Sequence, residues 1–124
     1  MADRNDEVLK SLALSIATIY TLLVDVCAAL PVPIGLPVDR HIPGELAIPA
    51  IQRVTEVAHD QPMGEHQTQQ LYTGCIHLLA AIDLYVLCAA GYRDTRAEGV
   101  AVNLLYADAA LAPLNRWLLI NESD

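Results

Sequence analysis

Residues 86–99, VLCAAGYRDTRAEG, join two long apolar segments through a short polar turn. Gly91 suits the end of a helix because glycine readily adopts the left-handed conformation found there. Thr95-Arg96-Ala97-Glu98 matches a capping box, in which the Thr hydroxyl and the Glu carboxylate bind free backbone N–H groups at the start of a helix. The stretch therefore predicts one helix that ends at Ala90 and another that begins near Thr95.

Helical spacing of apolar residues extends over most of the chain, and no run of alternating β-branched residues predicts a strand. We expect helices over about residues 5–30, 45–59, 65–90 and 95–120, the last one kinked or split near Pro113. Short connections after the second and third helices favour antiparallel neighbours. The prediction is an all-α, single-domain antiparallel four-helix bundle that spans residues 1–124.

The connection between the first two helices is unusual. Residues 31–44, PVPIGLPVDRHIPG, form a longer segment than most helix connections, and the segment is rich in proline yet apolar. We expect it to pack as a lid-like loop over one end of the bundle rather than to act as a free linker.

Composition excludes several classes of protein. Hydrophobic residues make up 54% of the chain and charged residues only 18%, which is far from the composition of disordered chains. The net charge of −8 argues against a nucleic-acid partner, because binding to phosphates requires clustered Lys and Arg. Three cysteines without CxxC spacing, Cys27, Cys75 and Cys88, fit neither a disulfide framework nor a zinc site. A reducing cytoplasm is the expected compartment.

Membrane insertion is not the expected state. The acidic N-terminal residues do not resemble a signal peptide. Residues 12–30 and 71–90 approach the length of a membrane span, but Asp25 and Asp83 lie within them, and a charged side chain is costly near the centre of a bilayer.

Glu56 and His59 have the Glu-x-x-His spacing that diiron bundles use to hold metal. The chain has no second copy of the motif, and helical phase places both residues opposite the apolar side of their helix. We therefore predict no metal and no cofactor. Metal binding by Glu56, His59 or His77 through an oligomer interface stays open.

Asp83 is the anomaly in the helical phase, because it falls beside Tyr72, Ile76 and Leu87, which are assigned to the apolar side of the third helix. An unpaired carboxylate there would be costly. Counting the helical rise per residue places polar residues from the apolar sides of other helices at about the same level along the bundle as Asp83. The prediction is a polar pocket built from Asp83, Asn103, Tyr106 and Tyr20 and closed by Arg40 or His41.

The predicted pocket supports one functional hypothesis and one purely structural alternative. In the first, the bundle binds a small, mostly apolar metabolite and acts as a cofactor-independent isomerase, cyclase or lyase, with Asp83 and Tyr106 as catalytic groups. Tyr20, Asn103, Arg40 and His41 would then bind the substrate. Alternatively, the polar residues form a satisfied internal network that only fixes how the helices pack.

The alternative function is assembly. Several leucines interrupt the predicted polar faces of the helices, and such a group exceeds the scattered exposed apolar residues of a monomer. A homodimer would cover these residues, which are Leu14, Leu22, Leu84, Leu104, Leu105 and Leu111. The chain would then be a homo-oligomeric scaffold or a regulatory interaction protein.

Overall fold

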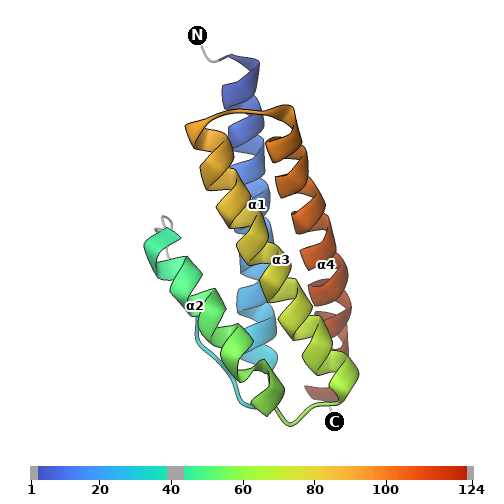
Figure 1. Cartoon of the computed structure of the whole chain (residues 1–124). Coiled ribbons are helices and arrows are strands. Elements are labelled where there is room, and N and C mark those ends of the chain that lie inside the picture. Colours follow the sequence, from blue (N-terminus) through green and yellow to red (C-terminus); the bar gives the residue numbers. More distant parts are fainter. Residues whose placement is uncertain (1–2, 39–43, 123–124) are drawn as a thin grey trace.

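The computed structural model describes residues 3–38 and 44–122 and is all-α (Figure 1). The helices are α1 (Arg4–Ala29), α2 (Gly44–Val57), the single turn η1 (Ala58–Asp60), α3 (Glu65–Ala90) and α4 (Asp94–Glu122). No strand occurs within these ranges. The predicted all-α class with four packed helices is confirmed.

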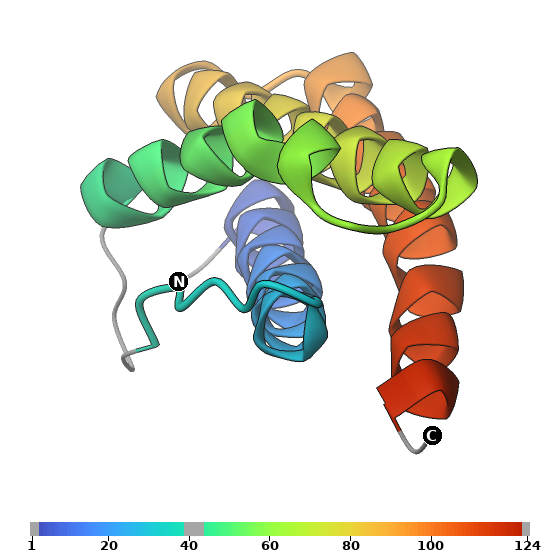
Figure 2. The ribbon, with the colours of Figure 1, turned by 90° about the horizontal axis from the view of Figure 1, so that it is seen from below.

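The helices do not alternate in direction along the chain. In Figure 1, α3 runs opposite to α2 and to α4, whereas α1 and α2 run the same way. α3 packs against each of the other three helices, and α1 also packs along α4 (Figure 2). This arrangement differs from the fully antiparallel order expected from the sequence, and the segment between α1 and α2 explains the difference.

Residues 31–38, which we call the strap, lie along the side of α1. The Ile34 N–H donates to the Cys27 carbonyl at 2.9 Å, and the Tyr20 hydroxyl donates to the Pro37 carbonyl at 2.8 Å. Three extended residues span about 10 Å, and the seven helical residues beside them rise by about the same amount. The strap thus leads the chain back along α1. α2 therefore starts beside the middle of α1 and runs in the same general direction, at an angle to it (Figures 1 and 2).

The strap differs from the lid over one end of the bundle that the sequence suggests for residues 31–44. Its described hydrogen bonds are with the side of α1, at Cys27 and Tyr20, and with Gln61 after η1, so a lid over one end of the bundle is not confirmed. Residues 39–43, which include Arg40 and His41, lie outside the described part of the chain.

Gln61 holds the beginning of the strap. Its side chain is 7% exposed, accepts a hydrogen bond from the Val32 N–H at 3.0 Å and donates one to the Val32 carbonyl at 2.8 Å. Pro31 and Pro33 have no N–H group, so Val32 carries the only backbone donor of this tripeptide. The pair therefore fastens the exit of α1 to the end of η1.

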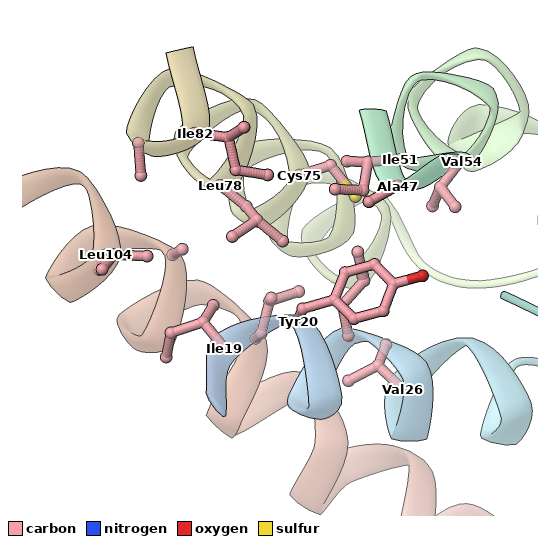
Figure 3. Packing of buried hydrophobic residues seen from close by; sticks show 14 of the residues in the cluster. Ile19, Tyr20, Val26, Ala47, Ile51, Val54, Cys75, Leu78, Ile82 and Leu104 are labelled. Atoms are coloured by element: carbon pink, nitrogen blue, oxygen red, sulfur yellow. The ribbon is translucent and has the colours of Figure 1, made fainter. Parts of the chain in front are cut away.

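The core lies where α1, α3 and α4 meet. α2 contributes its apolar side to this core where it packs against α3. Fully buried residues include Leu23 of α1, Leu78 of α3 and Leu111 of α4. Figure 3 shows the part of this core around Tyr20, which rises from α1 toward α2. A Cβ atom at Gly74 would overlap the Leu111 side chain, so this glycine permits the close approach of α3 and α4.

α3 ends at Ala90, as predicted, but the capping of the turn between α3 and α4 differs from the prediction. Gly91 has φ −154° and ψ 95°, which is extended and not left-handed. α4 starts at Asp94, one residue before Thr95, so the predicted capping position of Thr95 is wrong. Instead, the Arg96 guanidinium donates to the Gly91 carbonyl at 2.6 Å and closes the turn. α4 continues through Pro113 without a split.

Candidate functional site

The predicted pocket residues do not share one enclosed site. Asp83 is exposed on α3, and Tyr106 is 55% exposed on α4. Tyr20 is 6% exposed, and its hydroxyl is bonded to Pro37 of the strap. The predicted enclosed position is therefore wrong for Asp83 and Tyr106. Among the predicted residues that the structure describes, Asn103 and Tyr106 lie in one cluster, and their proposed chemical roles stay predictions; Arg40 and His41 lie outside the described residues.

The error has a physical cause, because α3 and α4 are apolar on more than one side. The side of α3 with Tyr72, Ile76 and Leu87 was assigned to the core but is exposed. On α4, Leu104 and Leu111 were assigned to the outer side but are buried, whereas Leu105 is exposed as predicted. Helical phase finds a core only where one face alone is apolar.

His77 is the partner that the sequence reading did not assign to the cluster. Its Nδ1 lies 2.9 Å from Oδ1 of Asn103, and its ring lies 5.3 Å from the Tyr106 ring, centroid to centroid. Asn103 Nδ2 donates to the Gly99 carbonyl at 2.8 Å, which orients the amide. Because an amide oxygen only accepts, this contact is a hydrogen bond in the tautomer that carries the hydrogen on Nδ1.

Glu56 and His59 are both exposed, in agreement with the outward phase expected for them. The His59 ring meets the Tyr72 ring edge-on, with centroids 5.7 Å apart. Within residues 3–38 and 44–122, no group of three or more His, Cys, Asp or Glu residues is arranged to hold a metal ion. His59 thus packs on a tyrosine rather than completing a ligand set.

An apolar surface runs along neighbouring sides of α3 and α4, which meet where His77 packs on Tyr106. We call it the outer surface. The His59 ring of η1 borders it at Tyr72. Its large members are 38% to 66% exposed: Tyr72, Ile76, Leu87, Val102, Leu105 and Tyr106. Together they expose on the order of 600 Å², the upper end of the range for the largest apolar patch of a typical monomer.

Two open clefts lie away from the outer surface. One, of about 340 Å³, lies between α1 and α4 beside Asp25 and Asn115. The other, of about 350 Å³, lies between the strap and α2, with Ile34, Pro37 and Leu46 among its walls and Arg53 as its cationic group. Both volumes fall in the lower part of the range for small-molecule sites.

The cysteines lie in the core and form no disulfide. Burial raises the pKa of the Cys27 thiol to about 12. The pKa of the Cys75 thiol is also raised, first by burial and then by the nearby Cys27. Since the thiolate is the reactive form, neither side chain is a nucleophile at neutral pH.

The chain matches no protein-family model, no curated protein and no solved structure. α1 and α3 are long and apolar enough to cross a membrane by length and composition, and 28% of the most apolar window of each is buried. Core helices of soluble proteins share that composition, so it does not distinguish the two environments.

Proposed function

We propose that this chain is a non-catalytic helical interaction protein that binds another protein through its outer surface. One observation carries the proposal, namely the group of large exposed apolar side chains along α3 and α4. Exposed tyrosine, leucine, isoleucine and valine side chains in contact with water cost free energy that a partner recovers by covering them. Aromatic residues such as Tyr72 and Tyr106 are also enriched in protein interfaces.

The polar interior supports binding over catalysis. Gln61 and Thr68 are the buried polar side chains of the described residues, and each is bonded within the chain, to Val32 and to the Gly64 carbonyl respectively. No buried side-chain N or O atom in these ranges lacks a hydrogen-bond partner. A substrate site instead directs a few polar groups toward the ligand.

Site-specific cross-linking in cells tests the proposal. A photo-crosslinkable amino acid replaces Leu105, and the control replaces Leu14, a leucine of similar exposure on α1. We expect protein adducts at position 105 and not at position 14. Equal labelling at both positions, or no adduct at 105, would exclude the outer surface as a binding site.

Small-molecule binding is the second candidate, and the cleft between the strap and α2 favours it. Its walls are apolar, and Arg53 at the cleft suits a carboxylate on an apolar chain. In this proposal residues 34–37 act as the lid-like wall of the cleft. We expect decanoate to bind and Arg53→Ala to weaken binding about tenfold, with Arg116→Ala as the control. Absence of heat in titration calorimetry contradicts it.

We place the protein in the reducing cytoplasm as part of the same proposal. The free, buried thiols of Cys27, Cys75 and Cys88 support this compartment, because proteins of oxidising compartments more often pair their cysteines.

A further inference from the structure

We infer that the occupant of the outer surface is a second copy of this chain, so that the protein is a homodimer with a two-fold axis in this interface. The inference rests on the proposed function and adds the identity of the partner. Two properties of the surface carry it: its area and its arrangement of large and small side chains.

The area matches the need of a stable dimer. A standard protein interface buries about 800 Å² on each partner. The six large residues of the outer surface expose on the order of 600 Å² by themselves. The exposed Ala109 and the half-buried Ala80 lie among them in helical phase, and the surrounding polar residues add further area. One copy therefore offers enough surface, without any additional segment, to hold another copy.

Large and small residues alternate on the same surface. On α4, Leu105 lies between Ala101 and Ala109, each one helical turn away. On α3, Ala80 lies one turn from Ile76 and two turns from Leu87. A two-fold interface is formed by one patch facing its own copy, so the patch must hold both projections and the spaces that receive them. The outer surface has both.

Three carboxylates lie on or beside the surface. Helical phase puts Asp83 between Tyr72 and Ile76 on α3 and Glu98 between Val102 and Leu105 on α4, whereas Asp108 lies beyond Leu105. Because each copy brings these carboxylates to the contact and each chain carries −8, two copies repel one another weakly, and salt should strengthen their association.

The mass of the purified chain in solution tests this inference. We expect sedimentation equilibrium at micromolar concentration to give twice the 13.4 kDa of one chain, and we expect added salt to tighten the dimer. Leu105→Glu should raise the dissociation constant at least about tenfold, whereas Leu14→Glu should leave it unchanged. Both positions are exposed, so both variants should keep the helicity and melting temperature of the parent chain.

Other results overturn the inference in distinguishable ways. A monomer in solution with adducts to a different protein at position 105 in cells would leave the proposed function standing and exclude the second copy. A monomer without adducts would reject both. A monomer that floats with neutral phosphatidylcholine vesicles would assign the surface to lipid. A dimer that Leu14→Glu disrupts and Leu105→Glu does not would place the contact elsewhere.

Discussion

The Gln61 side-chain amide binds both backbone groups of Val32, at 3.0 Å to the N–H and 2.8 Å to the carbonyl. This is the two-bond pattern that neighbouring strands use, supplied here by one side chain. It lets Val32, which has a proline on each side, pair both of its backbone groups within the chain. The direction of α2 relative to α1 depends on this segment, so Gln61 is a structural residue of the whole fold.

Replacing Gln61 should destabilise the protein. Gln61→Ala leaves the Val32 N–H and carbonyl without their partner, which should lower the free energy of unfolding by about 1–3 kcal/mol. Gln52→Ala, at an exposed position on α2, is the control and should change it by less than about 0.5 kcal/mol. Urea unfolding followed by circular dichroism measures both. Equal effects of the two variants would mean that the pair does not hold the strap.

The Tyr20 hydroxyl tests the other end of the strap. Tyr20→Phe keeps the ring in the core and removes only the bond to the Pro37 carbonyl, so we expect a loss of about 1 kcal/mol. Tyr20→Ala also empties the space of the ring between α1 and α2 and should cost about 3–5 kcal/mol. Thermal unfolding of the three proteins gives the comparison. An unchanged stability of Tyr20→Phe would show that the Pro37 carbonyl is satisfied by water.

Gly74 should tolerate no side chain while Leu111 is present. Gly74→Ala forces a Cβ into Leu111 and should cost about 1–3 kcal/mol despite the better helix propensity of alanine. Gly35→Ala is the control, because a Cβ there meets no atom within 4 Å and no described glycine has a positive φ. A double-mutant cycle with Leu111→Ala measures the overlap, and additive effects would exclude it.

Alkaline pH should destabilise the fold through its buried thiols. The pKa of Cys27 rises from 9.0 to about 12 on folding because burial disfavours the thiolate. A raised folded pKa gives stability that is fully present below pH 9 and lost as pH rises toward about 12. Burial raises the pKa of Tyr20 in the same direction.

Urea unfolding as a function of pH checks this expectation. The unfolding free energy of the parent chain should fall above pH 9, and Cys27→Ala should flatten part of that fall whatever its own stability at neutral pH. Native protein should also resist iodoacetamide at neutral pH and label when unfolded. Rapid labelling of Cys27 in the native protein would contradict its burial.

Much of the fold could be predicted from the sequence, because helix formation depends on the local spacing of apolar residues and on the positions of proline and glycine. The predicted ranges of all four helices agree with the structure to within a few residues. Leu105 and Leu14 were correctly expected to be exposed. The candidate site was harder to predict from the sequence. His77 and Asn103 are 26 residues apart, and neither spacing nor phase indicates that one side chain reaches the other.

The sequence by itself determined that the chain forms four apolar helices, because residue spacing decides which segments are helical. Only the tertiary structure decided which faces of those helices are buried. On α3 and α4 several faces are apolar, so core and surface differ not in composition but in whether another helix lies against them. For that reason Asp83, expected inside, lies outside, and the leucines Leu104 and Leu111, expected outside, lie in the core.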